Sequence, residues 1–333
     1  MATVIERPVD KKSNHRSEAP AHLKGGTHRQ HHQGVSRRQA KQQLPSRKEI
    51  PFNWPVMSWL LIMHVAALAA PFFFTWQGLV VALALHWLTG GIGICLGFHR
   101  LLTHSSFKTH PVVRYGLAVI GGWAGEGGAV DWVSGHRQHH AHSDHDEDPH
   151  SPNEGAWWSH VMWLSRSVYG QSCDVYTMRW APDLAKDPVM RFIDKMAIPF
   201  HFVLGISLFL IGYLTQGAYL GWSLVFWGMF ARLVFVLHCT WLVNSASHMW
   251  GYRNYETTDQ SRNNWLVALL SYGEGWHNNH HAYPRMANHG HRWWEIDITF
   301  RTIRLMQRLG IGVMLSTTNT ATKTKPPMCT NRH

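Results

Sequence analysis

Histidine is the residue type whose spacing in this chain points most directly to chemistry. The sequence has 333 residues and 26 histidines. Eight of these fall into three short groups: His99 and His104; His136, His139 and His140; His277, His280 and His281. Neutral imidazole binds iron, copper and zinc, so the residue type alone does not name the metal. Eight imidazoles exceed the four ligands that one zinc ion usually takes, and their number therefore predicts two metal ions.

The spacing within each group predicts which imidazoles can share a site. The second and third groups have the pattern i, i+3, i+4, which puts the three side chains of a group on one face of a helix. His99 and His104 are five residues apart, which is about 140° around an ideal α-helix. We therefore expect these two to share a metal only if the helix ends between them. Otherwise they bind different metals.

Four apolar runs near the histidine groups are long enough to cross a bilayer, which takes roughly 20 residues. They are Val56–Trp76, Leu79–Gly97, Ile198–Leu214 and Tyr219–Val243. The breaks between the members of each pair are short, so we expect two helical hairpins. The glycines of the second run, of which Gly93 is one, permit close approach of a neighbouring helix. Arg232 interrupts the fourth run, where it could snorkel or contact a polar substrate group.

These patterns predict an all-α integral membrane protein with four transmembrane helices in two hairpins. Residues 111–130 read as an interfacial or re-entrant helix, and residues 141–195 as part of a polar cap. Both termini and all three histidine groups then fall on one side. We expect a helical cap on that side to hold a site for two metals.

The net charge of +11 is uneven along the chain. Residues 1–50 contain 11 Lys and Arg against 4 Asp and Glu. A basic tail before a first membrane helix predicts a cytoplasmic location for the termini and for the metal site. We expect three parts: a disordered tail over 1–50, a membrane domain over 51–315 and a flexible tail over 316–333. The tail lacks any folded nucleic-acid-binding motif, so we expect no nucleic-acid partner.

Cysteine usage excludes several other metal sites. Cys95, Cys173, Cys239 and Cys329 are far apart, and no Cys-x-x-Cys pair occurs. This pattern indicates a reducing compartment and argues against zinc ribbons, iron–sulfur clusters and disulfide frameworks.

The three histidine groups, in their order, resemble those of the membrane fatty acyl desaturases. The segments that carry the resemblance are His99-Arg-Leu-Leu-Thr-His104, His136-Arg-Gln-His-His140, His277-Asn-Asn-His-His281, Trp241-Leu-Val-Asn-Ser-Ala-Ser-His248 and Gly273-Glu-Gly. The similarity extends from about residue 53 to 310 and is greatest to the Δ9 or stearoyl type. It implies an enzyme that uses O₂ and two electrons to introduce a cis double bond into a saturated acyl chain attached to CoA or a membrane lipid, with O₂ reduced to water.

The resemblance also implies roles for individual residues. Two iron ions would be held by the eight histidines above together with His248, and Asn244 would reach one iron through water. Trp132 would wall an apolar tunnel for the acyl chain, and Thr240 and Trp241 would lie at its bend. We expect Leu83 and Trp87 to affect the depth of the tunnel.

Carboxylates near the histidine groups are candidates for orienting the imidazoles. Asp131, Asp144, Asp148 and Glu274 are close enough in sequence, although the stretch from Asp144 to Asp148 could equally form a solvated loop. Other histidines receive no metal role at this point. We expect His142, His145 and His150 at the surface, and His64 and His86 to be packing or interfacial residues.

The sequence departs from the acyl-CoA enzymes of animals immediately before the second histidine group. Those enzymes have an Arg-Asp pair that contacts CoA, whereas this chain has Ser134 and Gly135. This difference favours a lipid-linked substrate over acyl-CoA without excluding acyl-CoA. No haem or flavin domain is appended, so we expect electrons from a separate acidic carrier such as ferredoxin or a cytochrome b5-like protein.

Two alternatives remain at this point. A membrane di-iron hydroxylase would share the first hydrogen abstraction and differ in the second step. A histidine-rich metal transporter would need ligands near the bilayer midplane and a polar path, whereas these groups lie at helix ends.

Overall fold

The computed structural model describes residues 49–167, 174–311 and the backbone of 314–315. The predicted tails over 1–50 and 316–333 lie almost entirely outside the described residues. The described part is mostly helical, and three of its helices are long and apolar enough to cross a membrane: Trp76–Thr103, Ala197–Gln216 and Ala218–Met249. The expected helical membrane class is therefore confirmed.

The first apolar run forms a shorter helix than the sequence indicates. Helix α1 (Trp54–Ala67) begins at Asn53, whose side chain accepts a hydrogen bond from the Val56 N–H, and it ends well before Trp76. A 3₁₀ turn over Ala70–Phe73 follows. Pro71 lies in this turn, and proline lacks the N–H that a continuing α-helix would require. The expected single run over Val56–Trp76 is thus two elements.

The second apolar run is longer than expected and changes its winding. It starts as α2 (Trp76–His86) and continues as a π-helical segment over Trp87–Thr103. The segment ends between His99 and His104, and the His104 N–H donates to the His99 carbonyl at 3.1 Å. That five-residue turn is wider than an α-turn and brings residues five apart onto one face. The helix therefore ends between His99 and His104, which is the condition under which these two residues could share one metal.

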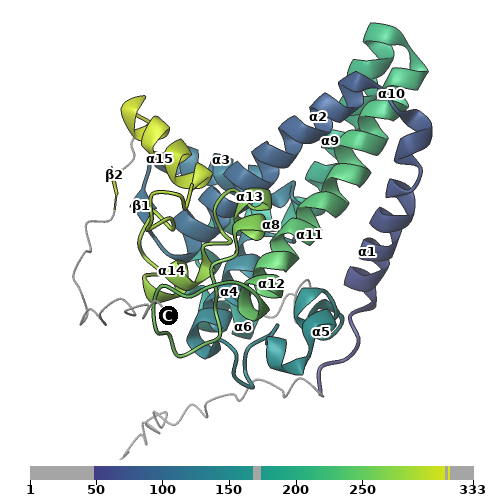
Figure 1. The fold of residues 1–333 in the computed structure, drawn as a ribbon. Helices are drawn as coiled ribbons and strands as arrows, with labels where there is room; N and C mark the ends of the chain where they lie inside the picture. Colours follow the sequence, from purple (N-terminus) through teal and green to yellow (C-terminus); the bar gives the residue numbers. More distant parts are fainter. Residues whose placement is uncertain (1–48, 168–173, 312–313, 316–333) are drawn as a thin grey trace, which may run out of the picture. The chain divides into compact units, whose positions relative to one another are not determined.

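Helices α9 (Ala197–Gln216) and α10 (Ala218–Val225) form an antiparallel pair joined at Gly217, whose φ of 93° favours glycine. Figure 1 shows the two helices side by side. A Cβ at Gly212 would lie 2.6 Å from the Gly221 backbone nitrogen, so this close approach requires glycine. The chain continues through a π-helical turn over Phe226–Ala231 into α11 (Arg232–Asn244) and α12 (Ala246–Met249).

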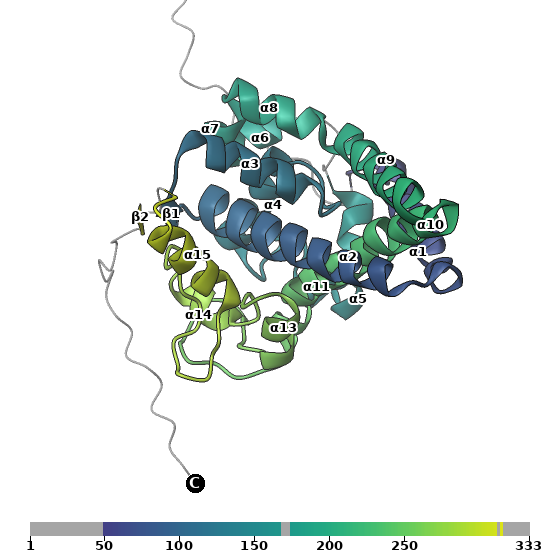
Figure 2. The same ribbon diagram turned by 90° about the horizontal axis from the view of Figure 1, so that it is seen from above.

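The remaining helices are shorter. They are α3 (Pro111–Gly122), α4 (Ala129–His142), α5 (Ala156–His160), α6 (Asp174–Trp180), α7 (Pro182–Ala185), α8 (Pro188–Lys195), α13 (Trp265–Leu270), α14 (His277–Ala282) and α15 (Ile298–Arg308). Strand β1 (Phe107–Lys108) pairs antiparallel with β2 (Met314–Leu315). In Figure 2, α13, α14 and α15 lie on one side of the long helix that begins with α2, and α3 and α8 lie on the other.

Contacts inside the bundle test two expectations, namely that Gly93 permits close approach of a neighbouring helix and that Arg232 snorkels or meets a polar group. A Cβ at Gly93 would lie 2.7 Å from the Gly121 Cα, which confirms close approach of α3 to the π-helical segment. Arg232 does not snorkel: its side chain is buried and donates to the carbonyls of Gly228 and Trp123. It therefore ties α11 to the end of α3.

Candidate metal centre

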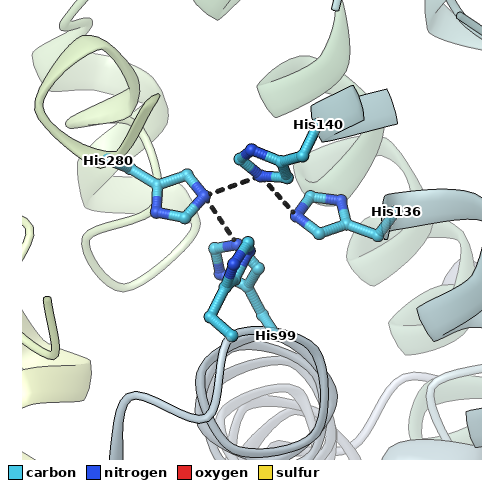
Figure 3. Close-up of side chains that lie close together, drawn as sticks. His99, His136, His140 and His280 are labelled. Atoms are coloured by element: carbon cyan, nitrogen blue, oxygen red, sulfur yellow. Dashed lines mark hydrogen bonds between the residues drawn. The ribbon is translucent and has the colours of Figure 1, made fainter. Parts of the chain in front are cut away.

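Five histidines converge at the end of the π-helical segment. His99 lies in that segment and His104 directly follows it. His136 and His140 come from α4 and His280 from α14, and one ring nitrogen of each of the five lies within 4.8 Å of the others. Figure 3 shows four of these rings pointing at one another. The His280 Nε2 lies 3.1 Å from the His99 Nε2 and 2.9 Å from the His140 Nε2. We call these residues the five-histidine group.

Four other histidines form a second convergence point, which we call the four-histidine group. His139 comes from α4, His248 from α12, and His277 and His281 from α14, and their ligand atoms also lie within 4.8 Å of one another. The His277 Nε2 is 3.0 Å from the His248 Nε2.

Helices α4 and α14 contribute to both groups in a reciprocal manner. On α4, His136 and His140 enter the five-histidine group and His139 enters the other; on α14, His277 and His281 enter the four-histidine group and His280 enters the five. Residues i and i+4 lie along one stripe of a helix, whereas residue i+3 is about 100° away from i+4. Each helix therefore presents a pair to one group and a single imidazole to the other.

Carboxylates hold four of the nine imidazoles. The Nδ1 atoms contact carboxylate oxygens in four pairs: His99–Glu274 at 2.7 Å, His139–Asp148 at 3.0 Å, His248–Asp144 at 3.0 Å and His281–Asp259 at 2.6 Å. Such a contact places the proton on Nδ1 and leaves the Nε2 lone pair free for a metal. The orienting role expected of Asp144, Asp148 and Glu274 thus has direct contacts behind it, and the solvated-loop alternative fails for Asp144 and Asp148, which are buried.

Two carboxylates fall elsewhere than the sequence suggests. Asp131 lines a cavity described below, and its charge acts on Asp194 of α8. The orienting role expected of Asp131 is taken instead by Asp259, which lies beside His281. It lies in a loop far from every histidine group in the sequence, and no spacing pattern marks it.

The electrostatics of the groups fit a metal. The pKa values of His104, His136, His140, His277 and His280 lie well below the usual histidine value, because burial disfavours the cation and neighbouring histidines repel it. Their rings are therefore neutral, the form that ligates metals. Among the described residues, the buried Nε2 atoms of His104, His139 and His281 have no hydrogen-bond partner. Converging neutral imidazoles with unsatisfied nitrogens fit a pair of first-row metal ions.

Two further histidines border the groups. The expectation that His150 lies at the surface is wrong: it is buried, and its ring centre lies 4.3 Å from that of His139. The loop that brings Asp148 under α4 also turns His150 inward. His289 is buried too, with its Nδ1 3.1 Å from the Glu274 Oε2. His142 and His145 are half-buried and exposed, respectively, close to what we expect for surface residues.

Arg100 completes the support of Glu274. Its guanidinium is buried and contacts Glu274 and Asp297, each at 2.8 Å. A buried arginine with two carboxylates is a rigid anchor, because its planar donors fit carboxylate oxygens in a fixed geometry. His99, Glu274 and Arg100 therefore form one connected unit.

An apolar cavity of about 510 Å³ reaches the five-histidine group. Its lining includes Trp132, Thr240, Trp241 and Asn244, together with His136. Trp132 stacks on His136 with ring centres 4.9 Å apart, and its indole N–H donates to the Glu126 carboxyl at 2.8 Å. The residues expected to wall and bend a tunnel thus meet in one cavity.

Leu83 and Trp87 lie elsewhere. They are not among the residues that line this cavity, and their side chains are 56% and 44% exposed on the outer surface of the long helix. Leu83 and Trp87 are four residues apart and therefore share one face of the helix. An apolar face of a membrane helix can contact lipid or the interior, and the sequence alone does not decide between the two.

The histidines within the membrane helices take different environments. His86 is buried beside Phe235 and Tyr272, as a packing residue would be. His64 of α1 belongs to a chain of imidazoles, with its Nε2 3.1 Å from the His238 Nε2 of α11. The His238 Nδ1 in turn lies 2.9 Å from the His160 Nε2 of α5. This chain fastens α1 to α11.

Long apolar helices that end at two buried histidine groups define a membrane-bound class of metal-dependent oxidoreductase. Residues 74–307 match the family model described as "Fatty acid desaturase". The chain belongs to the fatty acid desaturase family. It is an oxidoreductase that desaturates fatty acyl chains.

The chain is similar to curated desaturases from bacteria and plants, and three of them serve as examples. The chain is 48% identical over 262 residues to an "sn-1 stearoyl-lipid 9-desaturase" of Anabaena variabilis, covering 78% of this chain and 92% of the relative. It is 45% identical over 268 residues to an "sn-2 palmitoyl-lipid 9-desaturase" of Nostoc sp. (strain 36), covering 78% and 90%. An "Acyl-CoA C20 Delta5-desaturase" of Anemone leveillei is 42% identical over 251 residues, covering 75% and 77%.

Proposed function

We propose that the chain is an acyl-lipid Δ9 desaturase in which the nine histidines hold two iron ions. The five-histidine group would bind one ion. The four-histidine group would bind the other, with Asn244 contributing through a water molecule. Bound iron would supply the activation of O₂ that the removal of two hydrogens from an unactivated methylene requires. The observation that carries this proposal is the apolar cavity of about 510 Å³ whose inner end is lined by His136.

The protein's own residues position the substrate and exclude water. Trp132 stacks on His136 and can place an acyl methylene against the metal centre. Trp241 is 3% exposed and closes the same cavity from α11. A dry apolar site confines the reaction to the bound chain.

A lipid-linked substrate agrees with the residues that precede the second histidine group. Ser134 is buried, and its hydroxyl donates to the Val130 carbonyl at 2.7 Å, so it offers no charged contact to a CoA phosphate. The relatives from Anabaena and Nostoc carry names of lipid-linked 9-desaturases, while the Anemone relative carries that of an acyl-CoA enzyme. We place this chain with the first two.

In the membrane we propose four crossings, with the short helix α1 as the first and Trp76–Thr103, Ala197–Gln216 and Ala218–Met249 as the others. Both termini and the metal centre would face the cytoplasm, where the basic tail attracts an acidic electron carrier. Ferredoxin or a cytochrome b5-like protein fits this requirement.

Expression in a desaturase-deficient host, followed by gas chromatography of its fatty acids, tests the proposal. We expect a new cis-Δ9 monoene on membrane lipids from the wild type and no product from His136→Ala. A variant that lacks residues 1–40 should keep most of the activity. A hydroxylated chain without a new olefin would assign the chain to hydroxylation instead, and full activity of His136→Ala would overturn the ligand assignment.

A further inference from the structure

The apolar cavity reaches the outer surface between α1 and α9. Ile62 of α1 and Ile198 of α9 both line it, and their side chains are 57% and 61% exposed. The neighbouring outward residues on these helices are also apolar, as with Leu61 and Val203, which are 65% and 58% exposed. In the topology proposed above, in which α1 and α9 both cross the bilayer, their large exposed apolar side chains face lipid. The cavity therefore has one end at the metal centre and the other at a lipid-facing surface.

Contacts fasten α1 to α11 and to Ser165, and toward α9 the rings of Trp59 and His201, which also line the cavity, have their centres 5.6 Å apart. His64 contacts His238 of α11 at 3.1 Å. The Asn53 N–H donates to the Ser165 carbonyl at 2.8 Å. These contacts hold α1 as a fixed wall, so the opening does not depend on α1 moving away.

The polar residues of the lining argue against a highly anionic head group. Among the described residues that line the cavity, Lys195 is the only Lys or Arg, and it stands with Asp131, Asp194 and Glu126. Sites that recognise phosphates use several Arg or Lys side chains, and carboxylates repel the phosphate anions. A sugar or glycerol head group, in contrast, can hydrogen-bond to carboxylates and to hydroxyls such as that of Ser58 without a charge requirement.

From these contacts we propose that the opening between α1 and α9 is a lateral portal. Through it, one acyl chain of an intact membrane lipid with an uncharged head group slides from the bilayer to the metal centre. The head group stays at the rim beside Ser58 and Lys195. This proposal rests on the acyl-lipid function proposed above.

Tryptophan substitutions at the rim test the portal. Ile62→Trp and Ile198→Trp place a large ring in the opening, at sites already exposed enough to accept it. Leu61→Trp and Val203→Trp are the matched controls, because they are exposed on the same helices but do not line the cavity. The purified, iron-loaded proteins are compared in liposomes of a distearoyl glycolipid with an uncharged sugar head, supplied with O₂ and with reduced ferredoxin as the electron donor. We expect about tenfold less product from each rim variant, as for an obstructed substrate pocket, and near-normal product from the controls. Equal rates for rim and control variants would overturn the portal.

A second substrate separates failure of the portal from failure of the proposed function. Wild-type protein that desaturates stearoyl-CoA but no liposomal lipid would overturn both the acyl-lipid assignment and the portal. Wild-type protein that desaturates the glycolipid, with rim variants that match their controls, would overturn the portal alone. Faster turnover of an anionic stearoyl phospholipid than of the glycolipid would overturn the head-group part.

A readout that does not require activity covers the case in which a rim variant folds poorly. A glycolipid with a photoreactive diazirine at the middle of its stearoyl chain is irradiated with wild-type protein in liposomes, and labelled peptides are identified by mass spectrometry. We expect labels on both α1 and the first turns of α9, and competition by unlabelled glycolipid. Labels confined to other helices would contradict the portal.

Discussion

The two histidine groups lie side by side but are supported differently. In the four-histidine group, three of the imidazoles contact a carboxylate, through Asp148, Asp144 and Asp259. In the five-histidine group, within the part of the chain that the structure describes, only His99 does, through Glu274. A carboxylate fixes the tautomer and raises the basicity of an imidazole. If the groups bind iron as proposed, the smaller group would obtain its iron affinity from oriented ligands and the larger one from the number of its ligands.

The largest effect should come from removing one histidine from each group, which tests the difference in support between the two groups. We expect both His139→Ala and His140→Ala to abolish product, since the reaction needs both ions. Iron analysis of the purified proteins should separate them. His139→Ala leaves three ligands in its group and should lose that iron, whereas His140→Ala leaves four and should retain a larger share. Equal iron loss in the two variants would contradict the difference in support.

Neutralising the carboxylates should have the next largest effect. Asp259→Asn and Asp144→Asn should each weaken iron binding by about 10- to 100-fold, measured by competition with a chelator. Glu147→Gln is a suitable control, because Glu147 is exposed and its carboxylate pairs with His142, outside both groups. Unchanged iron affinity in both aspartate variants would show that these carboxylates do not support the ligands.

Glu274→Gln should differ from the aspartate variants by costing stability as well as iron. Glu274 shares the buried Arg100 with Asp297. Removal of the sole partner of a buried charge costs about 3–5 kcal/mol, and because Asp297 remains we expect a smaller but measurable loss. We expect a lower melting temperature of the apo-protein in detergent, in contrast to Asp259→Asn, which leaves no buried arginine behind. A melting temperature that matches the wild type would contradict the anchoring role of Arg100.

A smaller effect should appear in the pH dependence of substrate binding. Burial raises the pKa of Glu126 to about 7, although hydrogen bonds from Trp132 and Thr240 oppose the shift in part. The carboxyl in the apolar cavity is thus neutral below about pH 7 and charged above it, and the charge disfavours an acyl chain. We expect KM to rise above pH 7 in the wild type and to stay flat in Glu126→Gln. The raised pKa also means that the free energy of unfolding falls as the pH rises from the unfolded-state pKa toward 7.

The smallest effect concerns an outer support of the five-histidine group. Arg137, between His136 and His140, donates to the Leu102 carbonyl and pairs with Asp183. Burial opposes ionisation of Asp183, but the hydrogen bond and charge of Arg137 outweigh it and hold its pKa below the usual value. Asp183 is 54% exposed, so Asp183→Asn should cost less than about 1 kcal/mol. The difference from the wild type should vanish in acid, as the pH falls through the folded-state pKa. A cost that persists there would point to packing instead of charge.

The helical membrane class and eight of the nine histidines could be predicted from local pattern, whereas only the resemblance to the desaturase family singles out His248. Runs of apolar residues and the i, i+3, i+4 spacing act within a few helical turns, where sequence distance and spatial distance correspond. The same reasoning identified Asp144, Asp148 and Glu274, because each is close to a histidine group or its motif. It overlooked one local signal, Pro71, which breaks the first apolar run before Trp76.

What the sequence by itself determined is the set of ligands and the helices that carry them. The tertiary structure decided how that set divides: which histidines of α4 and α14 join which group, that Asp259 reaches His281, and that His150 turns inward. It also decided that Leu83 and Trp87 face outward while α1 and α9 line a cavity. These outcomes depend on the rotation and packing of helices about one another. Contacts between residues more than a hundred positions apart set that rotation, and no short-range pattern records them.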